Sequence, residues 1–240
     1  MCGLFPKDVS FAGFEVDNLF YLALVLTGVA FVLVIGTLIT FLIRYRARPG
    51  HKSFYTDGEN TKARILTISL ALIVFVVIDI NLAVHDHKAW DAVFGRPANA
   101  EPPLRVEIYP QQFAWNIRYA GDDGKFATGD DLTTLNQLHI PVGRPVLVQL
   151  KSKDVIHSFF IPNFRIKQDA VPGMVTMLSF AAKETGIYDI ACAEHCGLGH
   201  YRMRGVLTVD TAEDFQKFLD KTKSGRPSDQ TWGWDWVTRG

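Results

Sequence analysis

The sequence lacks an excess of either charge and contains little cysteine. Its 240 residues include 25 Lys and Arg against 25 Asp and Glu, so the formal net charge at pH 7 is zero. This balance argues against nucleic-acid binding through bulk charge. None of the three cysteines belongs to a Cys-x-x-Cys-His run, so the sequence offers no attachment site for a c-type haem. The first apolar segment lacks the short core and the small-residue cleavage site that are typical of a signal peptide.

Two of the three cysteines lie in a twelve-residue stretch that is rich in metal-binding side chains. It reads Cys192-Ala-Glu-His-Cys196-Gly-Leu-Gly-His200-Tyr-Arg-Met203, and a further imidazole, His157, lies upstream. Thiolates with imidazoles suit copper or zinc. The Cys-x3-Cys-x3-His spacing alone also permits a zinc site or a disulfide. The thioether and the upstream imidazole favour copper, because a weak axial methionine is typical of electron-transfer copper sites.

Two apolar stretches predict a helical hairpin that crosses a membrane. Leu19–Ile43 carries no charge and is long enough to span a bilayer as a helix. Ile65–Val84 is interrupted by Asp79 and Asn81, which fall near its far end, where polar groups cost less. The basic residues between the two spans predict that this loop is cytoplasmic and that both termini, with Cys2, lie outside. These residues are Arg44, Arg46, Arg48, Lys52, Lys62 and Arg64.

After a linker rich in Gly and Pro, Phe94–Pro103, the pattern changes to short apolar or alternating runs separated by turns. Period two with Val, Ile, Phe and Tyr predicts strands of a small all-β domain. The acidic, glycine-rich run Gly121–Asp131 predicts a solvated hairpin loop, because it does not complete a calcium-loop pattern. The expected strands are Leu104–Tyr109, Leu135–Ile140, Val146–Leu150, Val175–Phe180 and Met203–Val209.

The C-terminal part begins with a helix signal. Thr211-Ala-Glu-Asp214 resembles a capping box. Phe215, Phe218 and Leu219 follow at helical spacing, which predicts a surface helix packed on the β domain. The tail carries three tryptophans, which would be covered by a partner, by the membrane interface or by the chain's own barrel. They are Trp232, Trp234 and Trp236.

The run Cys-x-Glu-x-Cys-Gly-x-x-His-x-x-Met and the upstream segment Asp154–Gly173 resemble the copper-binding segments of subunit II of cytochrome c oxidase. The resemblance covers about residues 15–210. It implies a two-helix transmembrane hairpin followed by an all-β cupredoxin-type Greek-key barrel. The expected organisation is an outer segment (1–17), the hairpin (18–90), a linker (91–103), the copper domain (104–210), and a C-terminal helix and tail (211–240).

The resemblance also implies the cofactors. Cys192 and Cys196 would bridge the two ions of a dinuclear copper (CuA) centre, and His157 and His200 would each bind one ion. Met203 and the backbone carbonyl of Glu194 would be weak ligands. The side chain of Glu194 would help bind a magnesium ion shared with the catalytic subunit, because hard cations prefer oxygen ligands.

The implied function is that of an electron-accepting subunit. It would take electrons from cytochrome c and pass them to haem in subunit I, which reduces oxygen to water while the complex translocates protons. Subunit III is a further implied partner. The implied location is the bacterial inner membrane, with the N-terminus and the copper domain on the periplasmic side.

Two positions depart from the family pattern. The aromatic stretch that meets the donor usually reads Gln-Trp-Tyr-Trp, but here it reads Gln112-Phe113-Ala114-Trp115. We expect Phe113 or Trp115 to be the exposed contact for a cytochrome, ringed by acids such as Asp122, Asp123 and Asp154. The change resembles variants that work beside an alternative complex III. Arg64 stands where the family commonly has a proton-pathway glutamate, which puts proton uptake through this subunit in doubt.

Three other functions compete with this interpretation, and the residues argue against two of them. A membrane-tethered copper carrier without an oxidase partner would bind copper equally well. A quinol oxidase subunit II shares the hairpin and barrel but lacks the copper ligands that are intact here. Nitrous oxide reductase has a similar copper loop, but no helical hairpin is expected before it.

Overall fold

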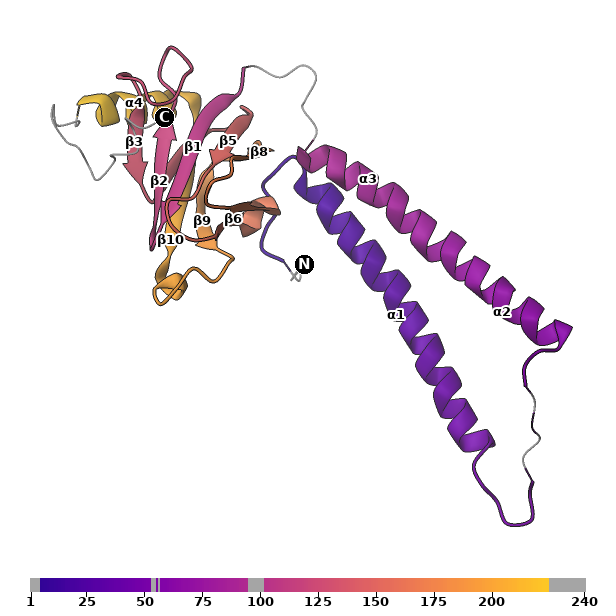
Figure 1. The fold of residues 1–240 in the computed structure, drawn as a ribbon. Coiled ribbons are helices and arrows are strands. Elements are labelled where there is room, and N and C mark those ends of the chain that lie inside the picture. The colour runs from indigo at the N-terminus through magenta and orange to yellow at the C-terminus, as the bar shows by residue number, and fades with distance from the viewer. Residues whose placement is uncertain (1–4, 53–54, 56, 95–101, 225–240) are drawn as a thin grey trace. The chain divides into compact units, whose positions relative to one another are not determined.

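The computed structural model of the chain describes residues 5–52, 55, 57–94 and 102–224 (Figure 1). It forms two compact units. A helical unit comprises residues 15–90, and a β-rich unit combines the N-terminal residues up to 14 with those from 91 onward. Residues 95–101 of the predicted linker lie outside the described residues, and so do four other residues named above, so the predictions made for them stay predictions. These four residues are Cys2, Trp232, Trp234 and Trp236.

The helical unit consists of two long apolar helices, as predicted from hydropathy. The first is α1 (Gly13–Arg44), and the second is a continuous 34-residue helix. The second helix comprises α2 (Thr61–Val74), a π-helical turn (Phe75–Asp79) and α3 (Ile80–Phe94). Both helices are long and apolar enough to cross a bilayer, and their apolar windows are not buried inside the chain. Each helix extends beyond the apolar run that predicted it.

The β-rich unit is a sandwich of two five-stranded sheets with the order β3-β2-β1-β5-β8 and β4-β10-β9-β6-β7. β1 pairs parallel with β5 and β4 parallel with β10, so the chain crosses between the sheets in a Greek-key manner, and the fold is the expected cupredoxin type. The strands are β1 (Leu104–Gln111), β2 (Ala114–Tyr119), β3 (Leu132–Leu135), β4 (Gln137–Pro141), β5 (Val146–Leu150), β6 (His157–Ile161), β7 (Ile166–Ala170), β8 (Thr176–Phe180), β9 (Gly186–Cys192) and β10 (Arg204–Asp210).

One predicted strand is wrong. The run Leu135–Ile140 does not form a single strand, because Asn136 has a left-handed backbone (φ 58°) that turns the chain from β3 in one sheet to β4 in the other. The side-chain Oδ1 of Asn136 accepts a hydrogen bond from the backbone N–H of Trp115 at 2.7 Å. Its carbonyl oxygen accepts one from the N–H of Val206 at 2.8 Å. Asn tolerates this conformation better than most residues, so one polar residue changes the topology.

The loop between β2 and β3 is less solvated than predicted. Asp131 is only 2% exposed, and its Oδ2 accepts hydrogen bonds from two backbone N–H groups of the same loop. The same carboxylate lies 3.6 Å from Nε of Arg118. Nη1 of Arg118 lies 3.3 Å from Oε2 of Glu107. Glu107, Arg118 and Asp131 are all buried, so the loop contributes a second carboxylate to the buried guanidinium of the sheet.

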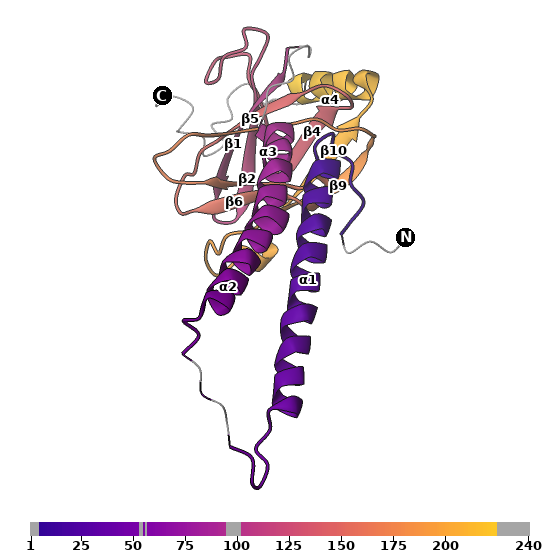
Figure 2. The ribbon, with the colours of Figure 1, turned by 90° about the vertical axis from the view of Figure 1, so that its right-hand side faces the viewer.

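The C-terminal helix α4 (Ala212–Ser224) confirms the capping-box prediction. The hydroxyl oxygen of Thr211 accepts a hydrogen bond from the N–H of Asp214 at 3.1 Å. Phe215 is buried in the core, and the ring of Phe218 stacks on His139 with centroids 3.8 Å apart. Figure 2 shows α4 lying beside β4 and β10, which it contacts.

The N-terminal segment also belongs to the β-rich unit. Val9 is 1% exposed, and its N–H donates to the carbonyl of Asn163 at 3.0 Å. The carbonyl of Val9 accepts a hydrogen bond from the N–H of Lys183 at 2.8 Å. The chain therefore lies along the sandwich immediately before α1 begins.

Candidate metal centre

The side chains of the predicted copper motif meet at one end of the sandwich. His157 is the first residue of β6, and Cys192 is the last residue of β9. These strands pair antiparallel, with Phe159 opposite Cys192, which brings the first imidazole to the start of the cysteine loop. The loop returns as β10 just after Met203. Strand pairing therefore places two segments that lie 35 residues apart against each other.

The sulfur and nitrogen atoms form one cluster. The two Sγ atoms of Cys192 and Cys196 are 3.8 Å apart, far beyond the roughly 2.05 Å of a disulfide. His157 Nδ1 lies 3.9 Å from Cys192 Sγ, and His200 Nδ1 lies 3.6 Å from Cys196 Sγ. Met203 Sδ is 3.7 Å from Cys196 Sγ. Each thiol therefore has its own imidazole, and the thioether lies beside one of the two.

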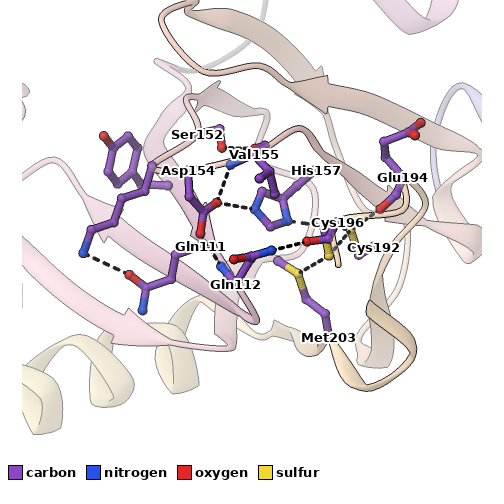
Figure 3. A network of polar contacts seen from close by, with 12 residues as sticks. Gln111, Gln112, Ser152, Asp154, Val155, His157, Cys192, Glu194, Cys196 and Met203 are labelled. Atoms are coloured by element: carbon purple, nitrogen blue, oxygen red, sulfur yellow. Dashed lines mark hydrogen bonds and ion pairs between the residues drawn. The ribbon is translucent and has the colours of Figure 1, made fainter. Parts of the chain in front are cut away.

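Glu194 presents two different groups. Its carbonyl oxygen lies 3.2 Å from Cys192 Sγ, at the edge of the cluster. Figure 3 shows its carboxylate directed away from the sulfur atoms, and the residue is exposed. The backbone oxygen thus lies beside the sulfur cluster, and the carboxylate is free to contact solvent, an ion or another subunit.

The protonation of the two thiols is unequal. Burial opposes ionisation of Cys192, but hydrogen bonds from His157 and from the backbone at Ser158 prevail and lower the pKa of Cys192 to about 6. Burial and the nearby Cys192 charge raise the pKa of Cys196 to about 11. A second thiolate therefore needs a cation between the sulfur atoms. Two thiols, two imidazoles, a thioether and a carbonyl form a donor set that fits copper.

A second layer of hydrogen bonds holds His157 in place, and the sequence did not point to it. Oδ1 of Asp154 lies 2.8 Å from His157 Nε2, which leaves Nδ1 facing the thiols (Figure 3). Oδ2 of Asp154 accepts a hydrogen bond from the backbone N–H of Gln112 at 2.7 Å, and Gln112 Nε2 donates to the carbonyl of Cys196 at 2.6 Å. The β1–β2 turn thus ties the two ligand-bearing segments together. The only signal in the sequence was an acid three residues before a histidine.

Phe113 packs directly on the cysteine loop. A Cβ added at Gly199 would lie 2.5 Å from Cδ2 of the Phe113 ring, so only glycine leaves room for that ring. A Cβ added at Gly197, whose φ is +126°, would lie 2.5 Å from Nε2 of Gln112. Phe113 remains 37% exposed.

Of the residues expected to surround a docked donor, one aromatic and two acids do not lie at the surface of this end of the sandwich. Trp115 is 0% exposed because β2 directs its ring into the core, 5.5 Å from Phe159, and so it cannot contact a docking protein. Asp122 and Asp123 follow the end of β2 that is opposite Phe113, about 17 Å away along the strand, and they cannot ring the copper end. Of the three predicted acids, only Asp154 lies near the site, where His157 and Gln112 occupy its oxygens.

Comparisons with known proteins identify the family. Residues 117–209 match the family model described as cytochrome c oxidase subunit II, periplasmic domain. The alternative cytochrome c oxidase subunit 2 of Bradyrhizobium diazoefficiens is 31% identical over 231 residues, covering 87% of this chain and 80% of that protein. Cytochrome c oxidase subunit 2 of Thermostichus vulcanus is 33% identical over 261 residues, covering 89% and 77%.

A solved structure is also similar to part of the chain. It is the periplasmic domain of subunit II of cytochrome oxidase from Bradyrhizobium japonicum, with 28% identity, 52% of this chain and 96% of that chain covered, and a TM-score of 0.46. The two subunit 2 relatives are aligned over most of both proteins. The chain belongs to the cytochrome c oxidase subunit II family and is a membrane-anchored subunit of a haem–copper oxidase.

Proposed function

We propose that this subunit carries a dinuclear copper (CuA) centre that receives electrons from cytochrome c and delivers them to haem in subunit I. The observation that carries the proposal is the convergence of six donor groups at one end of the sandwich, with an imidazole against each thiol. Cys192 and Cys196 would bridge the metals, and His157 and His200 would bind one each. Met203 and the carbonyl of Glu194 would be weak ligands. Copper bridged by two thiolates supplies one-electron acceptance and release.

The chain's own residues prepare this site for rapid electron transfer. Cys196, Met203 and His157 are each at most 3% exposed, so water is largely excluded from these three donors. Asp154 fixes the orientation of the His157 ring. A rigid, dry set of ligands changes little when charge arrives, which is the property that electron transfer needs.

We propose that the donor docks on the exposed apolar side chains at this end. Phe113, Leu198 and Tyr201 are 37%, 94% and 81% exposed. Two donor arrangements fit: a diffusing cytochrome c, or one held in a supercomplex with an alternative complex III. Trp115 would then serve inside the domain, packed 6.3 Å from the His157 ring, rather than at the surface.

The membrane placement belongs to the same proposal. The basic loop between α1 and α2 would face the cytoplasm, and the copper domain would face the periplasm of a bacterial inner membrane. Electrons would pass to subunit I, which reduces oxygen to water and translocates protons, with subunit III as a further partner. The exposed carboxylate of Glu194 would bind a magnesium ion shared with subunit I.

Copper loading of the full-length chain in detergent tests the central claim. We expect two coppers per chain, a purple colour and an electron-paramagnetic-resonance spectrum of one electron delocalised over both ions. Cys196→Ser should abolish that spectrum, because one thiolate cannot bridge two metals symmetrically. A chain that binds a single zinc tightly and develops no visible band with copper would contradict the proposal.

A further inference from the structure

The second apolar helix carries one ionisable side chain within its hydrophobic length, Asp79. Asp79 lies 15 residues after Arg64 (79 − 64), which is about 22 Å along a helix that rises 1.5 Å per residue. A hydrocarbon core of about 30 Å that begins near Arg64 therefore still surrounds Asp79. Asp86, one heptad further along, lies beyond that core.

An acid at this depth needs a hydrogen-bonding partner, because lipid tails supply none. The side chains one turn away on the same helix are apolar. They are Phe75, Val76, Leu82 and Ala83. Asp79 is exposed on the helix surface of the isolated chain.

Several polar side chains of the two apolar helices are engaged within their own helices. Thr27, Thr37 and Thr40 of α1 each donate a hydroxyl to a carbonyl one turn earlier, at 2.6, 2.8 and 2.7 Å. The amide of Asn81 donates to the carbonyl of Val77 at 2.9 Å. These four donors are thus occupied, and none of them needs Asp79.

The backbone is also unusual at this place. The π-helical turn Phe75–Asp79 ends at the acid, and Asn81 bonds to carbonyls of that turn. π turns inside α-helices are rare and occur frequently at functional sites. An irregular turn and an unpartnered acid therefore coincide within the apolar length of the helix, in its outer part.

We propose that Asp79 is an interface residue that accepts a hydrogen bond from a donor side chain on a transmembrane helix of the haem-bearing subunit. The helix face that carries Asp79 is then the face on which this subunit docks in the membrane. Intramembrane acids commonly face a protein interior and pair with a polar group there. The inference rests on membership of the oxidase family and is independent of the metal content of the β-rich unit.

The test uses the complete oxidase, purified through a tag on this chain, with haem and the tagged chain quantified in the same sample. Asp79→Leu makes the span more apolar, so insertion into the membrane is not impaired. We expect it to reduce the haem retained per tagged chain roughly threefold to tenfold during detergent washing, which is the range of a single interhelical hydrogen bond. Asp86→Leu, the same change outside the hydrocarbon core, should leave the ratio unchanged.

Asp79→Asn distinguishes the two kinds of donor. Retention equal to that of the unmodified protein indicates a neutral donor, and a loss as large as that of Asp79→Leu indicates a cationic one. An Asp79→Leu complex that retains haem normally would overturn the proposal. So would poorer accumulation of Asp79→Leu when this chain is expressed without the haem subunit, because Asp79 would then serve the fold of its own chain. The copper spectrum reports separately on the proposed electron-accepting function.

Discussion

Replacing Gly199 by alanine should loosen the contact between Phe113 and the cysteine loop. The added Cβ would lie 2.5 to 2.7 Å from three atoms of the Phe113 ring. Carbon atoms in contact settle at about 3.5–4.0 Å, so the ring must withdraw by roughly 1 Å. Overpacking of this kind costs about 1–3 kcal/mol. Because Phe113 is 37% exposed and can swing toward solvent, we expect the lower part of that range.

The expected change is measurable by thermal unfolding. Unfolding entropy is about 2.1 cal/mol/K per residue, so a unit of about 120 residues loses roughly 4 °C of Tm for each kcal/mol. Gly199→Ala should therefore lower the Tm of the copper-loaded protein by about 4–6 °C. Gly129→Ala is the matched control, because a Cβ there has no neighbour within 4 Å. It should change stability by less than about 0.5 kcal/mol.

A double-mutant cycle shows whether Phe113 causes the loss. In the Phe113→Ala background, Gly199→Ala has no ring to displace, so most of its cost should disappear. Equal costs in both backgrounds would refute the packing argument. An unchanged Tm in Gly199→Ala alone would refute it as well, since it would mean that the ring does not rest on the loop.

In the metal-free protein, the free energy of unfolding should rise from about pH 6 to 9, because Cys192 is deprotonated in the folded state and still protonated in the unfolded state. It should fall from about pH 9 to 11, because Cys196 keeps its proton in the folded state and loses it in the unfolded state. Denaturant midpoints measured across this range should show a maximum near pH 9, and a flat profile would contradict the unequal thiols. Glu194→Gln should leave the copper spectrum intact and weaken manganese binding in the complete oxidase; unchanged binding would show that the carboxylate is not a ligand. Phe113→Ala should slow reduction by cytochrome c without altering the copper spectrum, whereas Trp115→Ala should destabilise the domain by about 3–5 kcal/mol. Rates independent of ionic strength would favour a donor held in a supercomplex over a diffusing one.

Local features of the chain could be predicted from the sequence because short-range spacing determines them. Cys192, Cys196, His200 and Met203 lie in one loop, so their proximity follows from the chain itself. The apolar runs predicted both long helices, and Thr211 marked the start of α4. Hydropathy and capping act within a few turns of the chain, so a local pattern can reveal them.

The tertiary structure alone decided which residues surround the site. Strand direction placed Asp122 and Asp123 at the end of the sandwich opposite Phe113, and sheet packing buried Trp115. The pairing of Gln112 with Asp154 and Cys196 joins residues 42 and 84 positions apart, which no local pattern encodes. Such contacts depend on strand register and on the packing of two sheets. Sequence spacing therefore determines the cysteine loop, and long-range packing determines what orients, covers and exposes it.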